Sequence, residues 1–311
     1  VVKTEIHDMN YMEKKVKAIK VSFSHPRDIK FLRDKIKKAH LEKKGADINF
    51  VHQYLVEKNL TPLSLWEVKG DAIKEDGVLK IEGEIKQKSN DFYQDSRILT
   101  FDIEVYGGAI SEESIKKNPI ITIGFYGHNF KKVITWKKTK EEDVEILNSE
   151  ADLIERFKTV IRDYDPDFLV GYFSDGFDFP YIKGRAEKYK IKLDLGIDKS
   201  NIVIKKRGVN NSFKIKGIVH LDIFKFIRRI MPDTLKLDSY SLDSVAKEML
   251  NDKKDDLKFE EMNEAWDNED INKIIKYNLK DVELTYKIFL QIMPNIQELV
   301  KLISALPYEV C

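Results

Sequence analysis

Residues 99–105 read LTFDIEV, a run in which two acids lie two residues apart among apolar neighbours. Side chains alternate between the two faces of a strand, so Asp102 and Glu104 share one face and the apolar residues beside them share the other. Carboxylates placed side by side on a buried strand repel each other unless cations neutralise their charge. A divalent metal site would remove this repulsion, but an edge strand with a solvated acidic face gives the same pattern and is the more common explanation of this motif alone.

The surrounding sequence predicts a mixed sheet around this strand. Strand signals cover residues 97–106, 120–126 and 132–136, an amphipathic helix covers 150–164, and a buried strand covers 168–172. Strands that first form a meander and then gain a parallel partner across a helix are typical of a mixed sheet. We therefore predict an α/β fold with helices flanking a mixed β-sheet.

A hairpin and a mainly helical region are expected after this sheet. The hairpin joins residues 201–206 to residues 212–221 and turns near Asn210. The helices are expected at residues 223–229, 242–250, 260–266, 271–293 and 295–303.

The sequence pattern of the N-terminal part predicts a smaller α+β unit. Its elements are expected as a strand within residues 15–28, helices at 28–43 and 48–58, and strands at 63–69 and 78–85. Residues 85–95 then turn polar, which favours a domain boundary. We therefore divide the chain into residues 1–95, 96–290 and 291–311, the last being a helical segment.

A further acid lies in GYFSDGFDFPY, residues 171–181, directly after the buried strand. Loops between a strand and a helix often carry functional groups in α/β sheets. Asp178 lies between two phenylalanines and just before Pro180, which can begin a helix. This aspartate either caps that helix or takes part in catalysis.

The third acidic motif is YNLKD, residues 277–281, within a predicted helix. Tyr277 and Asp281 are four residues apart and therefore lie on one helical face. Taken alone, an aspartate flanked by Lys280 and Glu283 is usually part of a solvated helix face, so this pair by itself is a weak signal.

In this order, the three motifs resemble the proofreading 3′–5′ exonuclease of the ribonuclease-H-like class. More narrowly, the chain is similar to the family B DNA polymerases, particularly the archaeal ones, from about Phe23 to its C-terminus. The segments that carry the resemblance are LTFDIEVY, DPDFLVGYFSDGFDFPYIKGRAEK, IVHLDIFKFIRR, YSLDSVAKEML and KYNLKDVELTYKIF. The resemblance implies a ribonuclease-H-like mixed β-sheet with flanking helices (a DEDDy exonuclease domain) and a partial N-terminal domain that binds template.

The resemblance also implies the site residues. Asp102, Glu104, Asp178 and Asp281 would bind two divalent cations, Mg²⁺ or Mn²⁺, with Tyr277 beside the attacking water. Hard cations prefer oxygen ligands, and a pair of them can activate a water and stabilise the leaving oxygen. The implied reaction is hydrolysis of the 3′-terminal phosphodiester of single-stranded DNA, with release of nucleoside monophosphates during DNA replication.

One residue departs from the family pattern. The family commonly has Asn directly after the tyrosine of the second motif, where it helps to hold the terminal nucleotide, and this chain has Phe173. We therefore expect metal chemistry to be retained and contact with the DNA end to be altered. Two alternatives stay open: a catalytically weak or inactive exonuclease-fold scaffold that binds DNA, and a free-standing exoribonuclease.

Single-stranded DNA requires stacking surfaces and positive charge. The aromatic candidates are Tyr172, Phe173, Phe177 and Tyr181, and the basic candidates are Lys183, Arg185, Lys205, Lys206, Arg207, Arg228 and Arg229. Near the N-terminus, residues 23–29 resemble one wall of the pocket in which archaeal relatives sense uracil, which makes Pro26 and Ile29 candidates for uracil contact.

Composition restricts the partners less than it first suggests. The chain has 54 Lys and Arg against 53 Asp and Glu, a net charge of +1, but metal-binding acids and DNA-binding lysines would cancel in that sum. The one cysteine, Cys311, excludes a disulfide framework and suits a reducing compartment. No apolar run reaches the roughly 18–20 residues of a spanning helix. We expect a cytoplasmic, nucleoid-associated protein with no membrane partner.

The resemblance also implies further partners and the lack of the palm, fingers and thumb domains of a polymerase. Motifs of a polymerase palm such as D-x-x-S-L-Y-P do not occur, so we expect no polymerase activity from this chain alone. The chain resembles an excised fragment, or one part of a split polymerase, without palm, fingers and thumb. The implied partners are single-stranded or frayed primer-template DNA, the remaining polymerase domains and a sliding clamp.

Overall fold

The structure is a computed structural model of the 311-residue chain. It describes residues 2–25, 27–29, 32, 35, 48, 50–75, 78–107, 111–207, 210–252 and 259–311. Contacts divide the chain into two compact units, Val1–Leu60 and Thr61–Cys311. Among the described helices, none is both long and apolar enough to cross a membrane. The domain limits expected near residues 95 and 290 stay predictions.

The first unit contains a hairpin and a helix. Strands β1 (Lys3–Tyr11) and β2 (Lys14–Ser22) pair antiparallel across a two-residue turn whose residues both have positive φ, as tight hairpins require. Helix α2 (Phe50–Lys58) agrees with the helix expected at 48–58. Most of the helix expected at 28–43 lies outside the described residues.

The second unit begins with a long hairpin of β3 (Ser64–Glu75) and β4 (Val78–Phe92). Both strands run well past their expected C-terminal ends, and the polar run at residues 86–91 lies within β4. Such a ribbon exposes most of both faces, so polar side chains do not interrupt it. Gly70 faces Gly83 so closely that a Cβ on either would lie 2.0 Å from a carbonyl oxygen of the opposite strand.

A six-stranded mixed sheet forms the centre of the second unit, in the order β12-β9-β5-β6-β7-β8. Strand β5 pairs antiparallel with β6 and parallel with β9, and β9 pairs parallel with β12. This confirms the predicted mixed sheet. The strands are β5 (Ile98–Val105), β6 (Ile120–Gly127), β7 (Phe130–Thr135), β8 (Val144–Ile146), β9 (Phe168–Gly171) and β12 (Val219–Asp222).

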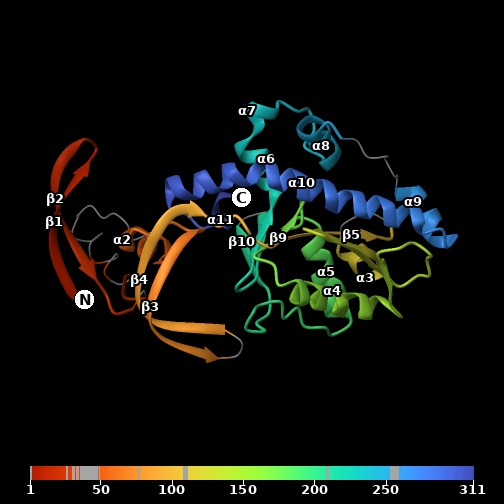
Figure 1. The fold of residues 1–311 in the computed structure, drawn as a ribbon, viewed down its shortest axis with the longest axis horizontal. Helices are drawn as coiled ribbons and strands as arrows, with labels where there is room; N and C mark the ends of the chain where they lie inside the picture. The colour runs from red at the N-terminus through yellow and green to blue at the C-terminus, as the bar shows by residue number, and fades with distance from the viewer. Residues whose placement is uncertain are drawn as a thin grey trace. The chain divides into compact units, whose positions relative to one another are not determined.

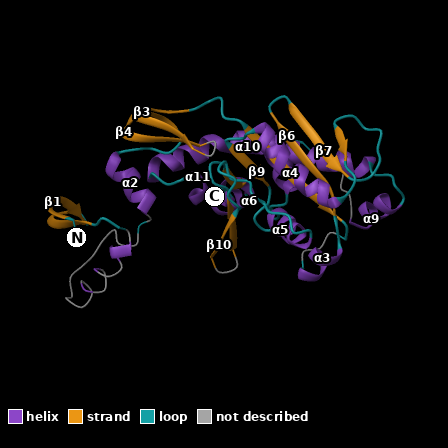
Figure 2. Cartoon of the chain, turned by 90° about the horizontal axis from the view of Figure 1, so that it is seen from below, coloured by secondary structure: helices purple, strands orange, loops and turns teal. Residues whose placement is uncertain are grey.

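Helices lie on both faces of this sheet (Figures 1 and 2). Helices α4 (Glu150–Tyr164) and α5 (Asp178–Lys188) pack on the face that carries Phe101 of β5. The long helix α10 (Asn272–Ile303) packs on the other face. The shorter helices are α3 (Glu112–Lys117), α6 (Ile223–Ile230), α7 (Pro232–Leu235), α8 (Leu242–Leu250), α9 (Phe259–Asp267) and α11 (Pro307–Val310).

Two local predictions were wrong. The run at residues 212–221 is not one strand: β10 (Val203–Arg207) pairs with β11 (Asn210–Lys214), and β12 then joins the main sheet after a turn at Gly217, where φ is +85°. Helix α10 does not end at Pro294. Proline removes one helical hydrogen bond, but buried side chains on both sides of it, such as Ile292 and Ile296, hold the helix in the core.

Candidate active site

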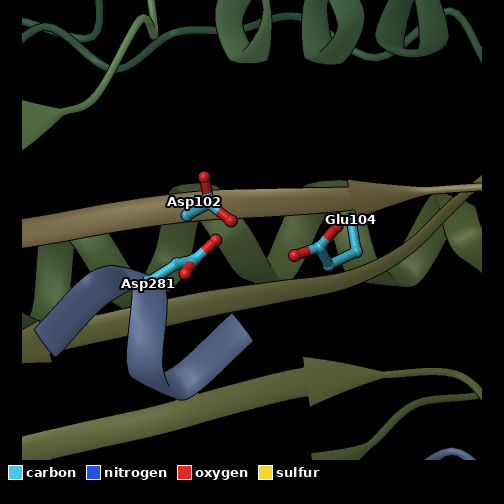
Figure 3. A group of neighbouring side chains, drawn as sticks. All are labelled: Asp102, Glu104 and Asp281. Atoms are coloured by element: carbon cyan, nitrogen blue, oxygen red, sulfur yellow. The ribbon is translucent and has the colours of Figure 1, made fainter. Parts of the chain in front are cut away.

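Three carboxylates meet between β5 and α10. Asp102 and Glu104 come from β5 and Asp281 comes from α10, and the side chains point toward one another (Figure 3). One oxygen from each lies within 4.8 Å of the others. Glu104 and Asp281 are buried and Asp102 is half-buried. Such a group of like charges at low exposure can hold a divalent metal ion, which would offset most of its negative charge.

Strand alternation and helix spacing produce this meeting. Phe101 and Ile103 point into the core beneath α4 and α5, so the acids between them face α10. On α10, residues 278 and 281 lie three apart and share the face turned to β5. The hydroxyl of Thr100, on the acid-bearing face of β5, donates to the carbonyl of Val282 at 2.8 Å and holds the helix there.

Asp178 is the first residue of α5 and only 2% exposed. Its Oδ1 accepts a hydrogen bond from the backbone N–H of Ile103, between the two acids of β5, at 3.1 Å. The N-cap position is held by Phe177, so Asp178 does not occupy the cap that the sequence allowed. Burial is the main cause that raises the pKa of Asp178 to about 8; the charges of Asp222 and Asp281 add to the rise, and backbone hydrogen bonds oppose it.

Tyr277 lies one helical turn before Asp281 and is half-buried. Its ring packs against the apolar cluster that includes Ile121, Trp266 and Ile274. Helix geometry places Tyr277 one turn from Asp281, and its role in orienting water stays a prediction.

The second motif ends in a turn held by a buried aspartate that sequence reasoning missed. Asp222, at the end of β12, accepts from the backbone N–H of Phe173 at 2.8 Å and from that of Asp175 at 3.1 Å. Burial and the nearby charge of Asp175 raise the pKa of Asp222 to about 7, while Lys225 opposes the rise. The only sequence signal was its place in the LDIF segment, which the resemblance had already marked.

The same turn exposes Phe173, the residue that differs from the family pattern, to solvent. Phe173 has φ +61°, a left-handed value that Asn adopts more readily than Phe, and its side chain is 45% exposed. Its ring meets Phe224 edge-on with centroids 5.0 Å apart. An exposed aromatic face therefore lies five residues from Asp178.

Two predicted nucleic-acid contacts are instead core residues. Tyr181 is fully buried, and its hydroxyl donates to carbonyls of Ser114 and Asn118 at 3.2 and 3.1 Å. Arg185 is 1% exposed and forms an ion pair with Glu150. Neither has surface for a base or a phosphate, because helical spacing turns both toward α3 and the start of α4. These placements correct the sequence-based assignment.

The remaining candidates are placed only in part. Phe177 is half-buried against the core. Lys206 and Arg207 end β10, but their side chains lie outside the described part of the structure. Of the uracil-pocket candidates, Ile29 is half-buried and Pro26 lies outside the described residues, so that prediction stays untested.

Comparison with known proteins decides the family. The family described as DNA polymerase family B, exonuclease domain, matches residues 41–245. The chain belongs to this family. The DNA polymerase of Pyrococcus glycovorans is 32% identical over 307 residues, which cover 98% of this chain and 35% of the relative. The DNA polymerase of Thermococcus gorgonarius is 29% identical over 307 residues, with the same coverage.

A solved structure shows the same fold. The family B DNA polymerase from the hyperthermophilic archaeon Pyrobaculum calidifontis superimposes with a TM-score of 0.74 at 20% identity, over 96% of this chain and 38% of that chain. This family B exonuclease chain thus spans about a third of the length of the relatives named here. Its acidic cluster offers only carboxylate oxygens, the donor set that suits a hard divalent cation.

Proposed function

We propose that the chain is the proofreading 3′–5′ exonuclease of a family B DNA polymerase. It hydrolyses the 3′-terminal phosphodiester of single-stranded DNA and releases nucleoside monophosphates. The observation that carries the proposal is the convergence of Asp102, Glu104 and Asp281 within 4.8 Å in a chain of this family. Asp178, bonded to the backbone between the first two acids, completes the set.

In this proposal Asp102, Glu104, Asp178 and Asp281 hold two divalent cations, Mg²⁺ or Mn²⁺. When bound, such ions stabilise charge on the phosphate and lower the pKa of a water molecule. Asp178, whose pKa is about 8 in the metal-free chain, gives up its proton when it becomes a ligand. Tyr277 orients the attacking water or the scissile phosphate through its hydroxyl.

The DNA end meets the exposed aromatic face next to this site. Phe173 stacks on a base where the family commonly has an asparagine, with Phe177 behind it, and Lys206 and Arg207 on the β10–β11 hairpin neutralise phosphates. A frayed primer end is therefore the natural substrate, and duplex DNA is a poorer one.

The proposal extends to organisation and partners. Residues 96–290 form the exonuclease domain, residues 1–95 belong to a template-binding domain, and residues 291–311 continue toward the palm. The remaining polymerase domains, in the same or a separate chain, and a sliding clamp are the protein partners. The site of action is the cytoplasm, at the nucleoid.

One nuclease assay tests the proposal. The full chain is incubated with 3′-labelled single-stranded DNA, duplex DNA or RNA, with Mg²⁺, with Mn²⁺ or with EDTA. We expect release of mononucleotides from single-stranded DNA with either metal and none with EDTA. Asp102→Ala abolishes this release, whereas the control Asp71→Ala, at an exposed position on β3, leaves it unchanged. Cleavage that survives EDTA or Asp102→Ala would overturn the proposal.

Phe173 favours a second candidate, the catalytically weak scaffold that binds DNA. An exposed phenylalanine retains stacking but lacks the polar group with which an asparagine can hold a nucleotide. Binding of single-stranded DNA without metal-dependent cleavage would select this candidate. Faster cleavage of RNA than of DNA would select the exoribonuclease.

A further inference from the structure

Asn278 contacts Asp102, the first acid of β5. It is on α10, three residues before Asp281, and has no exposed surface. Its Nδ2 donates to the Oδ2 of Asp102 at 2.8 Å and approaches the carbonyl oxygen of Asp102 at 3.3 Å. Its Oδ1 accepts from the hydroxyl of Thr122 at 3.2 Å. One buried amide therefore joins β6, α10 and the carboxylate of Asp102.

Two residues of β6 provide the space and the hydrogen bond that this amide requires. In the β5–β6 register Gly124 lies opposite Asp102, and Thr122 lies opposite Glu104. A Cβ at Gly124 would lie 2.7 Å from the Oδ1 of Asn278, closer than any normal contact. The glycine leaves the space that the amide fills, and the threonine hydroxyl sets which end of the amide faces Asp102.

The contact addresses a physical difficulty of the site. The terminal torsion of an aspartate is broad, and the negative charges of Glu104 and Asp281 favour rotation of the Asp102 carboxylate away from them. A neutral N–H donor opposes that rotation. It also leaves the net charge of the acidic group unchanged, whereas a lysine or arginine there would compete with a metal ion.

We propose that Asn278 is a positioning residue that fixes the Asp102 carboxylate for metal binding, with Gly124 and Thr122 holding Asn278 in place. The inference rests on the proposed function, because it assumes that Asp102 is a metal ligand. Partners that orient a ligand in this way commonly contribute about 10–100-fold to metal affinity or activity.

Titration of the full chain with Mn²⁺ tests the inference. The electron paramagnetic resonance signal of free Mn²⁺ gives its concentration, and from this the affinity of the chain for Mn²⁺ follows. Asn278→Leu keeps the size of the side chain and removes the donor, and we expect it to weaken Mn²⁺ binding by about 10–100-fold. The control Tyr164→Phe removes a hydrogen bond at the other end of β5, from the Tyr164 hydroxyl to the carbonyl of Ile98 at 2.9 Å. This control binds Mn²⁺ like the parent chain.

A kinetic readout separates positioning from simple damage to the fold. In Asn278→Leu the Mg²⁺ concentration for half-maximal cleavage rises by the same factor, and saturating Mg²⁺ restores much of the rate. A purely structural role would reduce the amount of active protein without moving that half-saturation. Mn²⁺ affinity within about twofold of the parent chain would overturn the inference, because a positioning partner contributes about tenfold or more.

Two further variants keep the test decisive. If Asn278→Leu does not fold, Gly124→Ala takes its place. The added methyl group pushes the Asn278 amide away from its present position without removing the Asn278 side chain, and we expect the same loss of Mn²⁺ affinity. Unchanged Mn²⁺ affinity in Gly124→Ala overturns the inference.

The variant Asp102→Ala distinguishes this inference from the proposed function. If it leaves Mn²⁺ binding intact, the proposed function fails; if it abolishes binding while Asn278→Leu does not weaken it, only the inference on Asn278 fails.

Discussion

Two buried carboxylate sites on opposite faces of the sheet differ in how their charge is balanced. Glu150 is 4% exposed and accepts from Arg185 Nε at 2.7 Å, from the Ile120 backbone N–H at 2.8 Å and from the Tyr189 hydroxyl at 2.8 Å. That site contains its own cation. The acidic cluster on the α10 face instead brings three carboxylates within 4.8 Å of one another. The first arrangement pairs its carboxylate with a cation of the chain, and the second groups the oxygen donors that a divalent metal ion prefers.

The largest expected effect follows from removing one charge of the acidic cluster. Glu104→Gln keeps the shape of the side chain but lowers its affinity for a cation, so we expect cleavage of single-stranded DNA to fall by about a thousandfold, or about 4 kcal/mol. Thermal stability in EDTA should not fall, because like-charge repulsion decreases. The cleavage rate is measured with 3′-labelled single-stranded DNA, and the thermal stability is measured as the melting temperature in EDTA. A large loss of stability with intact cleavage would make the cluster structural.

The matching change at the ion pair should affect stability instead. Arg185→Ala leaves the Glu150 carboxylate buried without its cation, and we expect a loss of about 3 kcal/mol in the free energy of unfolding. Cleavage per folded molecule and Mn²⁺ affinity stay at the parent values. Chemical denaturation and titration of active protein measure the two quantities. A shift in Mn²⁺ affinity would contradict the separation between the two sites.

Two buried aspartates outside the acidic cluster should make the stability depend on pH. The folded-state pKa of Asp178 is raised to about 8 and that of Asp222 to about 7, above the ordinary value near 3.8, so their contribution to stability is greatest at low pH. It is lost as pH rises through these values. In EDTA we expect the melting temperature to fall by at least about 2–4 °C between pH 5 and pH 8. Asp178→Asn should flatten that profile, and an unchanged slope would contradict the assignment.

The smallest effect concerns the departing residue. Phe173→Ala removes the exposed aromatic face, and we expect single-stranded DNA to bind about fivefold more weakly, near the lower limit for loss of one stacked base at about 1 kcal/mol. Mn²⁺ affinity should not change, because the turn is held by backbone bonds to Asp222. Fluorescence anisotropy with a labelled oligonucleotide measures the binding. Equal affinity would remove Phe173 from the DNA surface.

Much of this site was predictable because it depends on local periodicity. Alternation along β5 put Asp102 and Glu104 on one face, and spacing on α10 put Tyr277 one turn from Asp281. The same reasoning failed for Tyr181, since an aromatic residue near acids is equally typical of a stacking surface and of a core. Local pattern does not specify which neighbour covers a side chain.

By itself, therefore, the sequence determined the mixed α/β sheet, the strand and helix that carry the acids, and the family. Only the tertiary structure decided which carboxylates meet and what supports them. Asn278 and Asp102 are 176 positions apart, and Asp222 and Phe173 are 49 apart. Contacts over such separations depend on how α10 and β12 pack against β5 and β9. Packing minimises buried, unsatisfied polar groups across the whole domain, and no short stretch of residues contains that information.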